Sequence, residues 1–283
     1  MNACDIWSRQ LSQAGYVCDD MLSCACYAVD RLHRPLLVEG PAGVGKTFLA
    51  KALAQCLHKP LVRLQCYEGL DAPQVLYDWN YAKQLLAAHS AGTGNSVDNL
   101  YRWEYLLERP LLKALRLRPS PVLLIDEVGR ADEEFEAVLL ELLGEFQITI
   151  PELGTIVAEE PPWVILTSNR SRDLSDALRR RCLYTWLDYP TPERELAIIL
   201  QHVPQLSSEI AQRVVQAVKT LRGWNLLKRP GLAESIDWAK MLLEFREEDY
   251  SETIVRWTLS TVLKTQDDWI VVENRGIRAL WTE

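Results

Sequence analysis

A glycine-rich segment early in the chain has the residue types that bind a phosphate chain. Residues 40–47 read G-P-A-G-V-G-K-T and match the phosphate-loop pattern G-x-x-x-x-G-K-[ST]. Glycines let the backbone wrap closely, so that its N–H groups face the phosphates, and the start of the following helix adds a partial positive charge. Lys46 is expected to reach the β- and γ-phosphates, and the Thr47 hydroxyl to bind Mg²⁺. The predicted cofactors are therefore ATP and Mg²⁺. The expected nucleotide contacts are the loop residues Gly40, Pro41, Ala42, Gly43, Val44, Gly45, Lys46 and Thr47.

Two carboxylates end an apolar run in the middle of the chain. Asp126 and Glu127 follow V-L-L-I at residues 122–125, which predicts a buried strand that carries both side chains to the carboxyl edge of a sheet, where ligands bind in such folds. Asp126 is expected to bind the hydrated Mg²⁺ together with Thr47, and Glu127 to polarise the attacking water. The alternative is a strand that merely ends in a solvated acidic pair. The phosphate loop upstream favours the catalytic interpretation.

Two further polar features follow the next apolar run. Asn169 comes directly after it and is expected to orient water and to sense the γ-phosphate, although a Ser-Asn pair also commonly begins a loop. About ten residues further on, Arg179, Arg180 and Arg181 form a basic run. Charge runs are usually solvated helix faces, and that interpretation fits two of the three arginines. The remaining one is expected to enter the ATP site of a neighbouring subunit and stabilise transition-state charge.

The segments that must position these residues alternate between strand and helix, which predicts an α/β fold with a doubly wound parallel sheet. The expected strands are Leu36–Glu39, Leu61–Gln65, Pro121–Ile125 and Trp163–Thr167, with a β-hairpin over about 146–158. The expected helices in this part are Ile6–Gly15, Met21–Leu32, Thr47–Leu57, Gln74–Ser90, Leu100–Arg116 (interrupted or restarted at Pro110) and 132–143. Residues 91–96 predict a surface loop or an insertion.

The pattern changes after the segment Tyr-Pro-Thr-Pro at residues 189–192. From Glu193 to about Lys264 helical periodicity dominates. We therefore expect two domains, an αβα nucleotide-binding core over residues 1–190 and a smaller all-α lid over residues 191–283.

The composition is that of an ordinary globular protein, with 48% hydrophobic and 25% charged residues. The net charge of −8 argues against a global basic field for nucleic acid. No apolar stretch approaches the roughly 20 residues that span a bilayer, and the N-terminus lacks the apolar segment of a signal peptide. The predicted location is cytoplasmic, without direct membrane insertion and without nucleic acid as a partner.

The seven cysteines make an odd count without the spacing of a disulfide framework. In a reducing compartment we expect them to be free thiols. Cys24 and Cys26, with Cys18 nearby, raise the alternative of metal or redox chemistry, but positions i and i+2 of a helix point to different faces. Inert, buried or partly buried thiols are the favoured interpretation.

Taken together, these motifs resemble the AAA+ ATPases. The closest likeness is to the MoxR family, particularly its CoxD-like members, which are linked with maturation of carbon monoxide dehydrogenase-type molybdenum enzymes. The resemblance covers most of the chain, and the run from Asp126 to Gly154 is its most specific part. It rests on residues 37–47, 67–71, 124–136, 146–154, 166–170, 174–181 and 230–238.

The resemblance implies a ring-forming, usually hexameric ATPase with an αβα core and a helical lid. Such proteins act as chaperone-like remodellers of a client, here a metalloenzyme, often with a partner that carries a von Willebrand factor A domain. Alignment to the family makes Asn169 the first sensor. It places the arginine finger at Arg181, with Arg180 as the alternative. It also makes the hairpin at 146–158 an insertion that faces the ring pore or the substrate.

One departure from the family pattern concerns the lid. Many MoxR proteins carry a second sensor arginine in a Gly-Ala-Ser-Pro-Arg pattern, whereas residues 231–235 read Gly-Leu-Ala-Glu-Ser. Arg229 lies just upstream and could reach the γ-phosphate instead. The alternatives are a solvated arginine at a helix start, or a lid without this contact.

The leading functional hypothesis is an oligomeric ATPase that remodels or matures a client protein. One alternative is an activator of another enzyme class, such as a carboxylase or a nitric oxide reductase, because such ATPases share the same site. A nucleic-acid motor or loader is disfavoured by the acidic balance. A nucleotide-gated adaptor that hydrolyses little is disfavoured by Glu127, since an adaptor needs no water-activating carboxylate.

Overall fold

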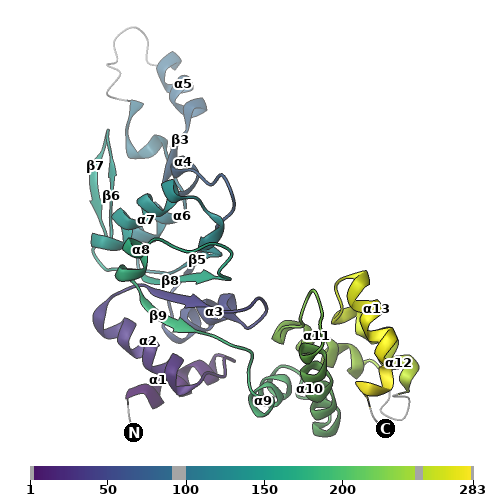
Figure 1. Cartoon of the computed structure of the whole chain (residues 1–283). Coiled ribbons are helices and arrows are strands. Elements are labelled where there is room, and N and C mark those ends of the chain that lie inside the picture. Colours follow the sequence, from purple (N-terminus) through teal and green to yellow (C-terminus); the bar gives the residue numbers. More distant parts are fainter. Residues whose placement is uncertain (1–2, 91–99, 246–250, 282–283) are drawn as a thin grey trace. The chain divides into compact units, whose positions relative to one another are not determined.

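The computed structural model of the chain, drawn in Figure 1, describes residues 3–90, 100–245 and 251–281. The chain divides into two compact units. The first holds residues 1–14, 18–39 and 47–186, and the second holds residues 15–17, 40–46 and 187–283. The phosphate loop thus groups with the C-terminal part of the chain. The surface loop predicted at residues 91–96 lies outside the described residues.

The first unit is built on a five-stranded sheet with the strand order β2-β5-β8-β1-β9. Its strands are β1 (Leu36–Glu39), β2 (Leu61–Gln65), β5 (Val122–Asp126), β8 (Trp163–Ser168) and β9 (Leu183–Trp186). All neighbouring pairs run parallel. β1, β5 and β8 are buried along their whole length, because a parallel sheet is covered on both faces. The predicted α/β fold class with a parallel sheet is confirmed.

Helices cover both faces of this sheet, with α1 and α2 on one side and α6 and α7 on the other (Figure 1). The helices of the unit are α1 (Ala3–Gln13), α2 (Asp20–Leu32), α3 (Lys46–Cys56), α4 (Ala72–Val75), α5 (Tyr81–Ser90), α6 (Pro110–Arg116), α7 (Glu133–Glu145) and α8 (Asp176–Arg181). On the first side, Trp7 of α1 packs against Trp163 with ring centroids 6.1 Å apart. On the second side, Leu37, Leu123 and Phe135 belong to one buried cluster.

The two long helices predicted between residues 74 and 116 are wrong. The chain instead forms the short strands β3 (Tyr77–Trp79) and β4 (Leu106–Glu108), which pair antiparallel. α5 follows β3, and α6 follows β4. The Asn80 side chain accepts a hydrogen bond from the N–H of Lys83 at 3.0 Å, so α5 has a fresh start after β3. α6 does begin at Pro110, as predicted, because proline fits the first turn of a helix.

The hairpin and the edge strand complete the first unit. β6 (Gln147–Ile150) and β7 (Gly154–Val157) pair antiparallel, as predicted. β9 was not predicted at all. It is a four-residue edge strand that pairs with β1. Thr185 is buried whereas Tyr184 and Trp186 are exposed, so β9 lacks the continuous buried apolar run of the central strands.

The expectation that all seven cysteines are free thiols is wrong for one pair. Cys4 and Cys24 form a disulfide, with Cα atoms 4.8 Å apart. α1 and α2 pack side by side and bring together two residues that are 20 positions apart in the sequence. That neighbourhood depends on helix packing, which the spacing of cysteines alone does not encode.

The other five cysteines are not part of a disulfide. Three of them are buried, namely Cys26, Cys66 and Cys182. Burial raises the pKa of all three thiols, to about 12 for Cys66 and for Cys182. They therefore stay protonated at neutral pH, and a protonated thiol is a poor nucleophile and metal ligand.

The second unit is helical in its C-terminal part. Its helices are α9 (Pro192–His202), α10 (Ser208–Gly223), α11 (Leu232–Leu243), α12 (Glu252–Thr258) and α13 (Gln266–Arg275). Hydroxyl side chains cap the first two, since Thr191 accepts from the N–H of Arg194 and Ser207 from that of Ile210. The core of the unit surrounds Trp238, which is fully buried and donates its indole N–H to Thr258 at 2.8 Å.

Candidate functional site

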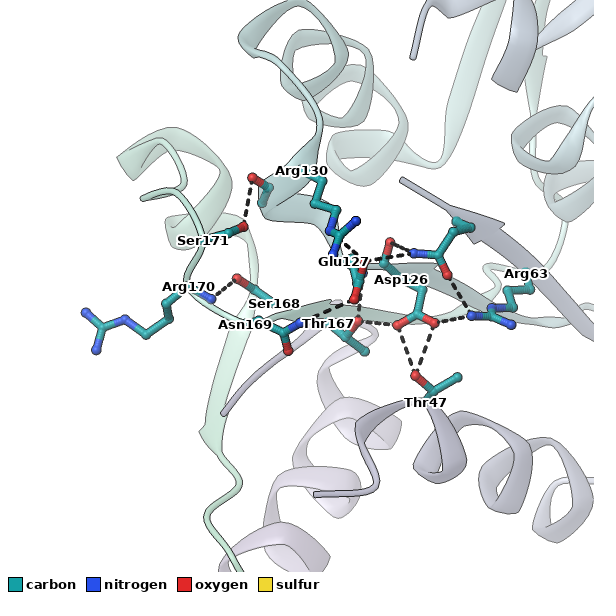
Figure 2. Close-up of polar contacts among 12 residues, drawn as sticks. Thr47, Arg63, Asp126, Glu127, Arg130, Thr167, Ser168, Asn169, Arg170 and Ser171 are labelled. Carbon is teal, nitrogen blue, oxygen red and sulfur yellow. Dashed lines mark hydrogen bonds and ion pairs between the residues drawn. The ribbon is translucent and has the colours of Figure 1, made fainter. Parts of the chain in front are cut away.

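Asp126 ends β5 and lies among hydroxyl groups from two other elements (Figure 2). Oγ1 of Thr47, in the first turn of α3, is 3.1 Å from both carboxylate oxygens of Asp126. Oγ1 of Thr167, on β8, donates to Oδ1 of Asp126 at 2.5 Å. The Asp126 side chain is 4% exposed. The structure thus brings together the two residues that the sequence proposes as Mg²⁺ ligands.

Glu127 follows Asp126 with a left-handed backbone, at φ 56° and ψ 45°. Its N–H donates to Oγ1 of Thr167 at 2.9 Å, so Thr167 contacts both acidic residues. Nδ2 of Asn169 donates to the Glu127 carboxylate at 3.3 Å, and Nε of Arg130 lies 2.8 Å from it (Figure 2). Left-handed geometry is uncommon outside glycine, and here it turns the carboxylate toward the end of β8.

Two residues of β2 join this cluster, and the sequence analysis missed both. Nη2 of Arg63 donates to Oδ2 of Asp126 at 2.6 Å, and Nε2 of Gln65 donates to Oε2 of Glu127 at 3.3 Å. β2 lies next to β5, with Gln65 opposite Asp126. The signal was present in the alternation of β2, because the two polar side chains are two positions apart and share a face. Only the strand order shows that this face meets Asp126.

The loop after β8 is tied to the segment after β5. Oγ of Ser171 donates to the carbonyl of Gly129 at 3.2 Å, and Nη2 of Arg172 donates to the carbonyl of Ala131 at 2.8 Å. Arg172 also pairs with the buried carboxylate of Glu136. Asn169 therefore belongs to a loop that is fixed to the segment that follows Glu127.

Residues 40–46 of the phosphate loop belong to the second unit, and the last of them contacts the first two. The ammonium of Lys46 donates to the carbonyls of Gly40 and Pro41 at 2.7 and 2.6 Å. Gly43 has φ +77°, and a Cβ on it would come within 2.9 Å of Cα of Gly231. Glycine is required there both for the left-handed backbone and for the close approach.

The start of α11 rests on this loop. The N–H of Leu232 donates to the carbonyl of Gly43 at 2.8 Å. Ser235, at the position where the family pattern has its sensor arginine, is fully buried and donates to Glu195 at 2.6 Å. Arg229 is exposed. Burial raises the pKa of the Tyr189 hydroxyl, and the positive charge of Arg229 partly opposes that rise. A backbone contact thus connects the start of α11 to the phosphate loop.

The short segment 15–17 also belongs to this unit, and the sequence analysis did not single it out. Cε2 of Tyr16 lies 3.8 Å from the position of a Cβ on Gly45. The carbonyl of Val17 accepts from Nη2 of Arg194 at 2.7 Å. The side chain of Tyr16 therefore lies near Gly45 of the phosphate loop, and a hydrogen bond connects Val17 to α9.

The three arginines of α8 differ in what they contact. Nη2 of Arg179 pairs with the buried Glu39 at 2.9 Å. Arg180 and Arg181 are exposed, and both line a cavity of about 760 Å³ with Arg34 and Phe146. Arg34 donates to the carbonyl of Arg181 at 3.2 Å and so holds the end of the helix. Arg179 is paired within the chain, while Arg180 and Arg181 are exposed.

The AAA domain, in its dynein-related subfamily, matches residues 35–182, which is more than half of the chain. The chain belongs to the AAA family. The matched region of this AAA protein contains the phosphate loop, Asp126 and Glu127, Asn169 and the arginines of α8.

Curated relatives share about a quarter of their residues with this AAA protein over most of its length. Protein CbbQ of Hydrogenophilus thermoluteolus is 26% identical over 71% of this chain and 69% of its own length. The denitrification regulatory protein NirQ of Pseudomonas aeruginosa is 25% identical over 66% of this chain and 67% of its own. An uncharacterised protein of Staphylococcus saprophyticus is 22% identical over 84% of this chain and 86% of its own.

Solved structures show the same fold. The Holliday junction branch migration motor RuvB of Thermotoga maritima superposes with a TM-score of 0.51 at 20% identity. That likeness covers 85% of this AAA chain and 66% of the RuvB chain. The comparison supports a parallel-sheet AAA core with helices C-terminal to it.

No described helix combines the length and the apolar character needed to cross a membrane. Within the described ranges, no group of three or more His, Cys, Asp or Glu side chains is arranged to hold a metal ion. The alternative of a cysteine metal site therefore has no support there.

Proposed function

We propose that this AAA protein is a ring-forming ATPase that uses ATP hydrolysis to remodel or activate a client protein. The observation that carries the proposal is the cluster at the ends of β5 and β8, where Thr47, Asp126, Glu127 and Asn169 meet. Phosphate binding alone would not need a water-polarising carboxylate held by an amide. The cluster therefore supports hydrolysis in addition to binding.

The donor set fits magnesium. The Thr47 hydroxyl and the Asp126 carboxylate are hard oxygen ligands that lie 3.1 Å apart, and Mg²⁺ prefers such ligands together with water and phosphate oxygens. When bound, Mg²⁺ supplies positive charge to the β- and γ-phosphates. Thr167 fixes the Asp126 carboxylate through its 2.5 Å hydrogen bond.

The other predicted site residues take the following roles in this proposal. Lys46 binds the β- and γ-phosphates. To do so, its ammonium gives up its hydrogen bonds to the carbonyls of Gly40 and Pro41. Glu127 accepts a hydrogen bond from the attacking water and polarises it, and Asn169 orients that water. Arg229 remains a candidate second sensor, while buried Ser235 does not reach a nucleotide from its position against Glu195.

Assembly enters through α8. Because Arg179 is paired with Glu39, the arginines available to a neighbouring subunit are Arg181 and Arg180, both exposed. We propose Arg181 as the arginine finger, with Arg180 as the alternative. An arginine supplied in trans makes hydrolysis depend on ring formation.

The client and its partner are proposed from the resemblance to MoxR proteins. The client is a metalloenzyme of the carbon monoxide dehydrogenase type, and a von Willebrand factor A-domain protein assists. Relatedness to a denitrification regulatory protein supports a regulator or activator role and keeps another client class open. Carbon monoxide dehydrogenase apoprotein and a carboxylase are the two probes to compare. The probe that raises ATP turnover identifies the class.

The test of hydrolysis compares wild type with Glu127→Gln and with Glu133→Gln. Glu133 is an exposed carboxylate in the first turn of α7 and serves as the matched control. Phosphate release, binding of a fluorescent ATP analogue and oligomeric mass with and without ATP are measured. We expect Mg²⁺-dependent turnover for wild type and Glu133→Gln, and nucleotide binding without turnover for Glu127→Gln. Equal turnover by all three proteins would contradict the role of Glu127.

A further inference from the structure

A buried carboxylate ends the strand that leads into the phosphate loop. Glu39 is the last residue of β1, is 1% exposed, and directly precedes Gly40. The rest of β1 is leucine and valine, as expected for a central parallel strand. Burying a carboxylate is unfavourable unless it is paired and hydrogen-bonded. The burial of the Glu39 carboxylate is therefore explained by its polar partners and not by apolar packing.

Those partners come from three different segments. Nη2 of Arg179, on α8, donates to Oε1 of Glu39 at 2.9 Å. The hydroxyl of Tyr184, on β9, donates to Oε2 at 3.2 Å. Nε of Arg170, in the loop after β8, lies 3.8 Å from the same oxygen. Burial and the Glu39 carboxylate raise the pKa of Tyr184.

Two of these segments carry a residue of the proposed site. Arg170 directly follows Asn169, and its backbone is left-handed with φ 55°. Arg179 shares α8 with Arg181, two positions further on. In an α-helix two positions correspond to a rotation of about 200°, so the face of α8 that meets Glu39 is opposite to the face that carries Arg181. The ion pair of Arg179 thus fixes the direction in which Arg181 points.

We propose that Glu39 is a positioning residue that couples the loop bearing Asn169 to the orientation of Arg181. The inference rests on the proposed function. Arg170 and Arg179 bind the two oxygens of one carboxylate, at 3.8 and 2.9 Å. A shift of the Asn169 loop that brings Arg170 closer to Glu39 weakens the hold of Glu39 on Arg179, and a shift away strengthens it. The state of one nucleotide site is thereby transmitted to the arginine that serves the next.

The test measures turnover number, KM and nucleotide affinity for Glu39→Gln, Arg179→Gln and Arg179→Lys in the full chain. Glu160→Gln is the matched control, because it also removes a carboxylate that is paired to a cation, Lys59, at 2.6 Å. We expect Glu39→Gln and Arg179→Gln to lower kcat by about ten-fold or more, with the nucleotide Kd changed by less than about three-fold. Arg179→Lys should recover part of the loss, and the control should match wild type.

A double variant separates positioning from simple support of the fold. If Glu39 acts through α8, Glu39→Gln added to Arg181→Ala lowers kcat no further than Arg181→Ala alone. Multiplicative losses in the double variant would overturn the proposal. So would parallel losses of nucleotide affinity and melting temperature with unchanged kcat.

Two further outcomes are distinguishable. Should Glu39→Gln fail to fold, Tyr184→Phe removes a single donor to Glu39 and should lower kcat in the same direction. If the wild type hydrolyses ATP and no variant at Glu39, Arg179 or Tyr184 changes kcat, the coupling is contradicted and the proposed ATPase function still stands. Absence of turnover in the wild type would instead refute the proposed function on which the coupling rests.

Discussion

Thr167 connects the two acidic residues of the site, since its hydroxyl donates to Oδ1 of Asp126 at 2.5 Å and accepts the N–H of Glu127 at 2.9 Å. It is fully buried on β8, the strand that pairs directly with β5. A single side chain thus sets the orientation of the proposed metal ligand and of the proposed water-polarising residue.

The variant Thr167→Val keeps the shape of that side chain and removes both hydrogen bonds. Hydrogen bonds to charged groups contribute about 1.5–3 kcal/mol, so we expect kcat to fall by roughly ten-fold to a hundred-fold. Phosphate release and the Mg²⁺ dependence of turnover are the measurements. Thr155→Val, at an exposed position of β7, is the control. Unchanged kcat in Thr167→Val would show that Asp126 and Glu127 are held by other contacts.

Arg63 offers a prediction about magnesium. Its guanidinium lies 2.6 Å from Oδ2 of Asp126, where it competes with a metal cation for the carboxylate. We expect Arg63→Gln to reach half-maximal turnover at a Mg²⁺ concentration a few-fold lower than wild type. Arg118→Gln, which removes an exposed ion pair with Glu159, controls for the lost charge. A higher Mg²⁺ requirement in Arg63→Gln would mean that Arg63 helps to hold the phosphates.

Local patterns in the sequence predicted the central strands well. The bounds of β1 and β2 match the prediction, because an apolar run before a glycine loop and a short alternating run are both local signals. The hairpin of β6 and β7 was also visible, since its turn residues lie between its strands.

The errors fall where structure depends on distant partners. β3 pairs with β4 across about thirty residues, with Tyr77 opposite Glu108, and each strand has only three residues. β9 is an edge strand that is stabilised by β1. Helical periodicity in those windows is not a reliable guide, since tertiary pairing overrides local propensity.

The candidate site shows the same division. The motif residues were identifiable because each follows a recognisable local pattern. Arg63, Gln65 and Glu39 were missed, because their contacts depend on the strand order β2-β5-β8-β1-β9. The disulfide of Cys4 and Cys24 likewise required the packing of α1 on α2.

That disulfide gives a stability prediction. It closes a loop between residues 20 positions apart, and closing a loop of this length in the unfolded chain is worth about 3 kcal/mol of unfolding free energy. We expect denaturant unfolding of wild type to shift to lower concentration when a reductant is added. The variant Cys4→Ser/Cys24→Ser should unfold at that lower concentration with or without reductant. An effect of reductant on the double variant would point to another thiol pair.

A pH prediction concerns Glu160. Hydrogen bonds from Lys59 Nζ at 2.6 Å and from Ser120 hold the pKa of the Glu160 carboxyl at about 2, against 4.5 ordinarily. The folded-state pKa is lowered, so this contribution to stability is complete above about pH 4.5 and is lost as the pH falls toward 2. The carboxyl is well exposed, which keeps the contribution small.

We therefore expect the melting temperature of Glu160→Gln to lie below that of wild type at pH 7, with the difference shrinking between pH 4.5 and pH 3. Lys59→Gln removes the main donor and should show the same pH dependence. A difference that stays constant over this range would contradict the linkage.

The most direct test of the account mixes two inactive variants. Glu127→Gln lacks its own water-polarising residue but carries Arg181, whereas Arg181→Ala has the intact site and lacks the finger. In a mixed ring, an Arg181→Ala site beside a Glu127→Gln neighbour has both groups. Random mixing of equal amounts makes about a quarter of the interfaces complete, so we predict recovery to roughly a quarter of wild-type turnover. A mixture as inactive as its components, with mixed assemblies shown by mass measurement, would contradict an arginine supplied in trans.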